Sequence, residues 1–227
     1  MTAGADQVVV APSLYAAPLL RIGDAVRAAT DGGADAFHVD IMDGHFVGPI
    51  SFGNLVVDAV RAATTLPLDA HLMVTNPASH VAWLADAGVR AVTLHVEAFA
   101  GGASQAIETL NQIRSRGMRA GIAIKPATSV GAIATLVGEV QHVLVMTVEP
   151  GSSGQPFLET MVPKILEIVR LFGPTIEVGV DGGINRHTAR TSLSAGARYL
   201  VAGSAVFTPN LEGTAEAIRA IRAAGAG

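Results

Sequence analysis

The chain contains no cysteine, which excludes disulfide bonds, thiolate nucleophiles and cysteine-based zinc sites. Histidine and carboxylate side chains are the metal ligands that remain. Aromatic residues make up only 4% of its 227 residues, and the formal net charge of −4 comes without any basic block. The sequence therefore offers no electrostatic footprint for nucleic acid or for an anionic membrane surface, and we expect neither as a partner.

Long hydrophobic runs are also missing, although half of the residues are hydrophobic. Gly, Asp and Arg interrupt the apolar runs well before they reach the length of a membrane span. Residues 1–7 lack a basic cluster followed by an apolar stretch, which a targeting segment would have. These absences predict a cytoplasmic protein that does not cross a membrane.

Short apolar runs rich in β-forming residues alternate with Ala-rich segments of helical spacing. The eight predicted strands are 8–11, 36–41, 66–72, 91–96, 119–124, 142–148, 176–180 and 199–202. The predicted helices are 24–30, 55–63, 78–87, 105–116, 161–171, 188–195 and 213–223. This order of elements is typical of an α/β protein with parallel strands.

Several predicted helices end in a similar Gly-containing phrase just before the next strand, as in Gly32-Gly33-Ala34-Asp35 and Ala87-Gly88-Val89. Such repetition favours a βα unit used about eight times, that is, a TIM barrel. A doubly wound open sheet would need a Gly-rich turn after its first strand, and Ser13-Leu14-Tyr15 stands there instead. We predict a single TIM (β/α)8 barrel domain over residues 1–227, with loose ends at 1–7 and 224–227.

Polar residues stand at the carboxyl ends of three predicted strands, where TIM barrels place their active sites. His38 and Asp40 alternate on one face of the second strand, His71 ends the third and Asp181 ends the seventh. Buried together, the two carboxylates would carry unbalanced negative charge, which a divalent ion would compensate. Mixed imidazole and carboxylate ligation suits Zn, Fe(II), Mn or Co, and the sequence does not choose among them.

Two carboxylates beside a metal ion indicate a particular reaction. A metal on a ketone oxygen stabilises the enediolate that forms when the neighbouring carbon loses its proton, and acid/base groups on opposite faces permit inversion there. We therefore expect epimerisation, with Asp40 and Asp181 as the catalytic pair. Met42, Met73 and Met146 would line the site above the metal, although barrel core is an equally good reading of their spacing.

Small residues follow the sixth, seventh and eighth predicted strands, and loops at the last two positions commonly bind phosphate in TIM barrels. These loops are Gly151-Ser152-Ser153-Gly154, Gly182-Gly183 and Gly203-Ser204. They predict a substrate that carries a phosphate group. The remaining histidines, His45, His80, His95, His142 and His187, are assigned to loop or structural roles.

With these motifs, the chain resembles the ribulose-phosphate 3-epimerase family from about residue 8 to residue 207. The resemblance rests on the stretches 38–47, 68–74, 145–151, 180–184 and 202–205. It implies that His38, Asp40, His71 and Asp181 bind the metal and that Asp40 and Asp181 transfer protons. It also implies that Ser13 and His71 touch the substrate, and that the phosphate group lies among Gly151, Ser152, Ser153, Gly154, Gly182, Gly183, Gly203 and Ser204.

The chain departs from the usual family pattern in three loops: residues 14–18, Gly48-Pro49, and Ser152-Ser153 where the family has Phe-Gly. We expect interconversion of D-ribulose 5-phosphate and D-xylulose 5-phosphate. The changed loops leave another ketose phosphate, such as D-allulose 6-phosphate, as the alternative. Family members often assemble, so a homo-oligomer is expected.

Two further alternatives differ in function class. Metal-dependent sugar-phosphate decarboxylases on a related barrel would need Lys where this chain has His71. A non-catalytic sugar-phosphate-binding barrel would be expected to have lost one acid/base residue, whereas both Asp40 and Asp181 are present.

Overall fold

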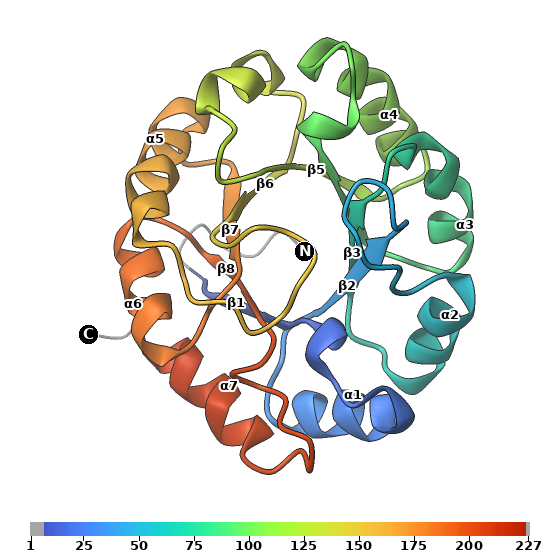
Figure 1. Ribbon diagram of the computed structural model, residues 1–227, viewed down its shortest axis with the longest axis vertical. Helices are drawn as coiled ribbons and strands as arrows, with labels where there is room; N and C mark the ends of the chain where they lie inside the picture. The colour runs from blue at the N-terminus through green and yellow to red at the C-terminus, as the bar shows by residue number, and fades with distance from the viewer. Residues whose placement is uncertain (1–6, 226–227) are drawn as a thin grey trace.

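A computed structural model describes residues 7–225 and contains a barrel of eight parallel strands surrounded by helices (Figure 1). The strands are β1 (Val9–Pro12), β2 (Phe37–Met42), β3 (Leu68–Met73), β4 (Ala91–His95), β5 (Arg119–Ile124), β6 (His142–Met146), β7 (Glu177–Asp181) and β8 (Tyr199–Ala202). Each predicted strand is present with ends shifted by at most two residues. The TIM-barrel prediction is confirmed.

The barrel closes between its first two strands. The strand order runs β1-β8-β7-β6-β5-β4-β3-β2, and a single parallel bridge from Ser13 to His38 joins the two ends of this sheet. The bridge lies just beyond β1, at the carboxyl-terminal end of the barrel. This seam therefore brings Ser13 beside the candidate ligands of β2.

Seven α-helices occur in the described residues, and each of the seven predicted helical segments overlaps one of them. They are α1 (Ile22–Asp31), α2 (Asn54–Ala63), α3 (Val81–Asp86), α4 (Ala103–Ser115), α5 (Val162–Phe172), α6 (Arg186–Ser194) and α7 (Thr214–Ala223). The connection between β5 and β6 carries a 3₁₀ helix, Val130–Leu136, in place of an α-helix. The predicted helix 78–87 is divided into a 3₁₀ turn, Pro77–His80, and the short α3.

The Gly-containing phrases end helices as predicted. Gly33 and Gly88 have φ angles of 89° and 75°, a left-handed conformation that costs glycine little. The expected loose ends fall mainly on residues 1–6 and 226–227, which lie outside the described residues. No helix between residues 7 and 225 is long and apolar enough to cross a membrane.

Alternation along the strands separates two environments. Residues such as Val39, Leu72 and Ile122 point outward and form the main apolar core with the helices. The inward-facing set includes a small apolar cluster and several buried polar side chains, among them His38, His71 and His142. Polar groups thus occupy the barrel interior because the strands place them there in register.

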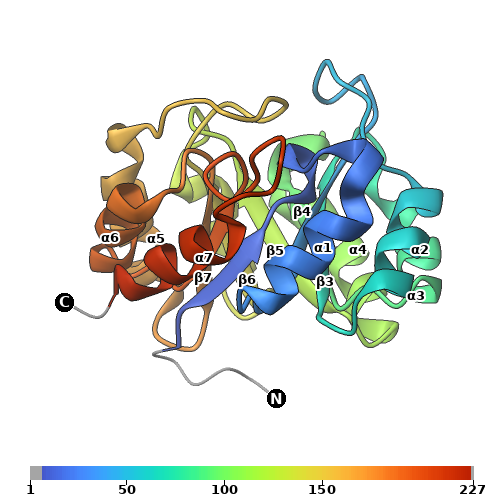
Figure 2. The ribbon, with the colours of Figure 1, turned by 90° about the horizontal axis from the view of Figure 1, so that it is seen from below.

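The carboxyl ends of all eight strands point to one side of the barrel. Figure 2 shows the long loops that follow β2 and β6 rising on this side above the strands. A parallel barrel gathers the loop after each strand at this end, which makes it the place to seek the site.

Helix α5 offers a test of the outer core. We expect Ile165→Ala to lower the free energy of unfolding by about 2–5 kcal/mol, because Ile165 is fully buried and leaves a cavity. Leu166→Ala is the matched control on the next residue, which is 37% exposed, and should cost under about 1 kcal/mol. Denaturant unfolding measures both, and equal losses would contradict the described packing.

Candidate active site

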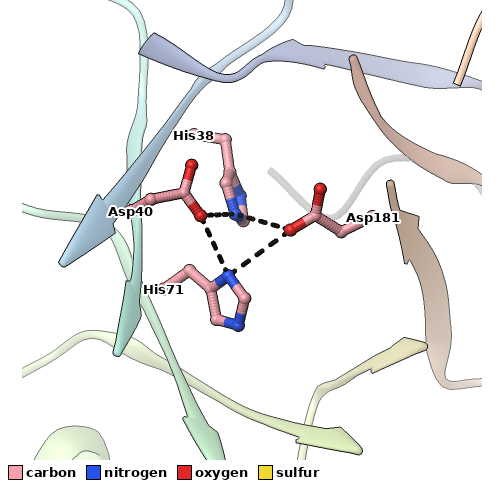
Figure 3. A group of neighbouring side chains, drawn as sticks. All are labelled: His38, Asp40, His71 and Asp181. Atoms are coloured by element: carbon pink, nitrogen blue, oxygen red, sulfur yellow. Dashed lines mark hydrogen bonds and ion pairs between the residues drawn. The ribbon is translucent and has the colours of Figure 1, made fainter. Parts of the chain in front are cut away.

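Four polar side chains from three strands converge at the carboxyl-terminal end of the barrel (Figure 3). His38 and Asp40 come from β2, His71 from β3 and Asp181 from β7. Asp40 and His71 are direct partners across the β2–β3 pairing, so strand register sets their closeness. The structure therefore brings together all four residues that the sequence suggested as metal ligands.

The contacts alternate between imidazole and carboxylate. Nε2 of His38 lies 3.4 Å from Oδ1 of Asp40 and 3.6 Å from Oδ2 of Asp181. Nδ1 of His71 lies 3.2 Å and 3.4 Å from the same two oxygens. The four atoms form a ring with the carboxylates on opposite sides, as Figure 3 shows. We call these four residues the donor ring.

A divalent cation fits the donor ring. Both ring nitrogens of His38 are buried, and neither has a hydrogen-bond partner among the described residues, an arrangement that is costly. Bonds of about 2.0–2.2 Å from a metal to nitrogen or oxygen would hold neighbouring ligands about 3–4 Å apart. All four contacts of the ring fall in that range.

The charges of the donor ring favour a cation as well. Burial would raise the pKa of Asp40 and of Asp181, but the two imidazoles outweigh it and hold both carboxyl pKa values below their usual range. Burial would lower the pKa of His38, yet the two carboxylates raise it to about 10. Two buried carboxylates thus demand positive charge, which a divalent ion can supply while leaving both imidazoles neutral.

Hydroxyl groups support both Asp residues, one through a carboxylate and the other through the backbone. The Ser13 hydroxyl donates a 2.6 Å hydrogen bond to Oδ2 of Asp40, the oxygen outside the ring. The Thr147 hydroxyl donates to the backbone carbonyls of Asp181 (2.9 Å) and Gly182 (2.6 Å) and fixes the end of β7. Thr147 was not among the predicted site residues, since a buried Thr in a strand is ordinarily a packing residue.

A pocket opens above the donor ring and encloses about 550 Å³ including its mouth. Asp40 and Asp181 are in its lining, whereas His38 and His71 are buried and do not reach it. The other predicted site residues in the lining are Ser13, Met42, Met73, Met146, Gly151, Ser152, Ser153, Gly154, Gly182, Gly183, Gly203 and Ser204. Tyr15, Val148 and Gln155 also line the pocket and were not predicted.

Two glycines after β7 allow the chain to pass closely around the pocket. Gly182 has φ 120°, and a Cβ there would lie 2.4 Å from a methyl carbon of Val148. Gly183 has φ 66°, and its Cβ would lie 2.5 Å from the backbone nitrogen of Phe157. Both the backbone conformation and the lack of space therefore require glycine directly after Asp181.

His95, for which the sequence predicts a loop or structural role, lies in the site region. It ends β4, and its Nε2 lies 2.9 Å from Nε2 of His71. Its Nδ1 lies 3.1 Å from Oε2 of Glu97. The signal that could have found it is the one used for His71, an inward-facing histidine at the carboxyl end of a strand.

The other four histidines lie away from the donor ring. His45 is exposed, with its ring against the Asp43 carbonyl, and His187 is exposed in the first turn of α6. His80 accepts a hydrogen bond from the Trp83 indole. His142 pairs with Glu177 at the opposite end of the barrel.

Comparisons with known proteins agree with the fold and with the family resemblance of the sequence. The sequence model of the ribulose-phosphate 3 epimerase family matches residues 9–207. The ribulose-phosphate 3-epimerase of Bacillus subtilis is 40% identical over 204 residues, 88% of this chain and 92% of that protein. The chloroplastic ribulose-5-phosphate-3-epimerase of Arabidopsis thaliana is 41% identical over 96% of this chain and 77% of its own length.

A solved structure of KGPDC from Streptococcus mutans is similar in fold, with a TM-score of 0.69 and coverage of 97% of this chain and 98% of that one. Its sequence identity of 12% supports a shared barrel and nothing about shared chemistry.

The turn after Asp181 gives a prediction. We expect Gly182→Ala to destabilise the protein by about 1–3 kcal/mol more than Gly138→Ala, because only residue 182 adds a steric clash to an unfavourable φ. Gly138 is the matched control, with φ 85° and nothing within 4 Å of the place that a Cβ would occupy. Denaturant unfolding compares the two variants, and equal losses would contradict the close approach of Val148.

Proposed function

Because the chain belongs to the ribulose-phosphate 3-epimerase family, we propose that it interconverts D-ribulose 5-phosphate and D-xylulose 5-phosphate by moving the proton on C3. The observation that carries the proposal is the pair of carboxylates, Asp40 and Asp181, on opposite sides of the donor ring and in the lining of the pocket. Inversion at carbon needs an acid/base group on each face, and this pair supplies both.

Each carboxylate would serve one face of the sugar. One, ionised at the start, removes the C3 proton as a base and leaves a planar enediolate, and the other, protonated at the start, delivers its proton to the opposite face as an acid. Their roles exchange in the reverse direction, so both must be able to hold and release a proton. Ser13 would keep Asp40 oriented through its hydrogen bond to Oδ2.

His38, Asp40, His71 and Asp181 would hold one divalent ion, which could be Zn, Fe(II), Mn or Co. When bound, such an ion stabilises the negative charge that develops on the ketone oxygen. Met42, Met73 and Met146 line the pocket with thioether groups, which pack against a planar intermediate without forming strong hydrogen bonds to it.

The phosphate group would bind among the loops after β6, β7 and β8, in which Gly151, Gly154, Gly182, Gly183 and Gly203 bring backbone N–H groups close to an anion. All five glycines line the same pocket as the carboxylates. Ser152, Ser153 and Ser204 add hydroxyl groups to this lining.

A homo-oligomer and a cytoplasmic location complete the proposal. Large apolar side chains on the surface support assembly, since Leu20 is fully exposed and Ile50 and Leu55 are each 79% exposed.

Two variants test the mechanism. We expect Asp40→Asn and Asp181→Asn each to lower turnover by about 10²–10⁴-fold or more, because each removes an acid/base group. The control is Asp69→Asn, a half-buried carboxyl in the barrel, whose partner is Tyr199 and which lies outside the pocket lining. The assay follows exchange of the C3 proton in heavy water together with epimerisation.

Near-normal turnover in either Asn variant would remove that residue from the mechanism. If the native protein with its metal exchanges no C3 proton of any ketose phosphate, the non-catalytic sugar-phosphate-binding barrel becomes the better description. Metal content of each variant is measured alongside, since both carboxylates also belong to the donor ring.

The residues around the pocket mouth suggest a second candidate substrate, D-allulose 6-phosphate. Tyr15, Ser152 and Ser153 line the pocket, and all three lie in loops that depart from the family pattern. Ser152 and Ser153 stand where the family has Phe-Gly, so two hydroxyl groups replace an apolar aromatic side chain.

We expect kcat/KM to be higher for D-ribulose 5-phosphate than for D-allulose 6-phosphate, because the family match extends over residues 9–207. Steady-state kinetics with both substrates measures the ratio. A ratio that favours the six-carbon sugar would keep the mechanism and replace the substrate.

A further inference from the structure

Two groups near the donor ring, the buried His95 and the half-buried Glu97, have no role in the mechanism above. Nε2 of His71, on the side of the ring away from the carboxylates, lies 2.9 Å from Nε2 of His95. Nδ1 of His95 lies 3.1 Å from Oε2 of Glu97. Three side chains from β3, β4 and the 3₁₀ turn Val96–Ala98 thus form one hydrogen-bonded chain that starts at a proposed ligand.

The direction of these hydrogen bonds is fixed at the far end of the chain. Oε1 of Glu97 accepts hydrogen bonds from the backbone N–H of Lys125, at 2.7 Å, and from the Thr128 hydroxyl. Hydrogen bonds hold the pKa of the Glu97 carboxyl down to about 2 against the effect of burial, so Glu97 is ionised and can only accept. The neighbouring Nδ1 of His95 must therefore carry a proton.

The tautomer of His71 follows from that constraint. A neutral His95 with its proton on Nδ1 has an accepting Nε2. Nε2 of His71 must then be the donor across the 2.9 Å contact. The remaining nitrogen, Nδ1 of His71, keeps its lone pair and faces the donor ring.

We propose that His95 and Glu97 are positioning residues that fix the tautomer of His71 and thereby set the affinity of the donor ring for its divalent ion. This inference rests on the proposed metal centre and adds two residues to it. Hydrogen bonding of this kind orients metal-binding histidines and increases their basicity as ligands.

The surrounding packing holds the chain of hydrogen bonds rigid. His71 and His95 are completely buried, and Phe46 covers the His95 ring at 4.9 Å between centroids. Nζ of Lys164 on α5 donates to the carbonyls of Lys125, Pro126 and Thr128, which secures the loop that supports Glu97. Helix α5 therefore holds in place the loop that donates hydrogen bonds to Glu97.

Glu97→Gln tests the direction of the chain with almost no change of shape. If the NH2 of the introduced Gln side chain faces His95, it donates to Nδ1 of His95. Both imidazoles must then adopt the opposite tautomer, which protonates Nδ1 of His71. If the NH2 faces the other way, it opposes two other donors, the Lys125 N–H and the Thr128 hydroxyl. Both arrangements weaken the metal site.

We expect Glu97→Gln to weaken binding of Zn²⁺ or Co²⁺ by about 10–100-fold, the usual effect of losing such a partner. Competition with a chelator measures the affinity, and thermal unfolding of the metal-free protein confirms the fold. The matched control is Glu177→Gln, which alters another His–Glu pair with a buried His and a half-buried Glu, with 3.1 Å between Nδ1 of His142 and Oε2 of Glu177, at the far end of the barrel. That control should keep native metal affinity.

Native affinity in Glu97→Gln, or equal losses in both variants, would overturn the inference. Nitrogen NMR of the native protein, labelled at histidine and loaded with Zn²⁺, provides a test that does not depend on folding of a variant. We expect proton signals on Nε2 of His71 and Nδ1 of His95, and a proton on Nε2 of His95 would refute the assignment. Failure of the native protein to bind any divalent ion would remove the metal centre itself, a result distinct from loss of this positioning role alone.

Discussion

The burial of two carboxylates beside two imidazoles at one end of the barrel is the constraint on which the site depends. One oxygen of Asp40 and one of Asp181 each lie 3.2–3.6 Å from nitrogens of both His38 and His71. Ionised groups removed from water are unfavourable unless another charge or a set of donors replaces the lost hydration. A divalent cation would resolve this problem and, when bound, would make the C–H next to a ketone more acidic. In the proposed function, stability of the buried cluster and reactivity toward a sugar would therefore share one physical cause.

The other end of the barrel shows how buried polar groups behave when they are structural. The Tyr199 hydroxyl donates to Asp69 at 2.5 Å, and Glu177 is paired with both His142 and Arg119. Each of these groups has a partner within the protein. In the donor ring, by contrast, both nitrogens of His38 lack hydrogen-bond partners among the described residues. The difference separates a network whose polar groups are all paired within the protein from a site whose buried nitrogens still need a partner.

Much of the fold and site could be predicted from sequence because both depend on periodicity. Strand alternation placed His38 and Asp40 on one face, and barrel closure brings distant strands such as β3 and β7 together without any local signal. Contacts between side chains on different loops are harder to predict from the sequence. Glu97 lies beyond the end of β4, and its partners Lys125 and Thr128 follow β5, so nothing local to Glu97 indicates them. The inward-facing position of His95 could be predicted, but its contact with His71 could not, because it depends on ring orientation and the strand-pairing partner of His71 is Thr93.

The arrangement also separates chemistry from specificity. The donor ring is fixed by β2, β3 and β7 and by buried partners such as Ser13 and Thr147, all of which belong to the barrel or its closing seam. Tyr15, Ser152 and Ser153 lie on loops above it and line the pocket. Substitution in those loops can change which sugar is held while the proton-transfer geometry stays the same. For this reason the departures of this chain from its family bear on the identity of the ketose and do not alter the residues of the proposed two-carboxylate mechanism.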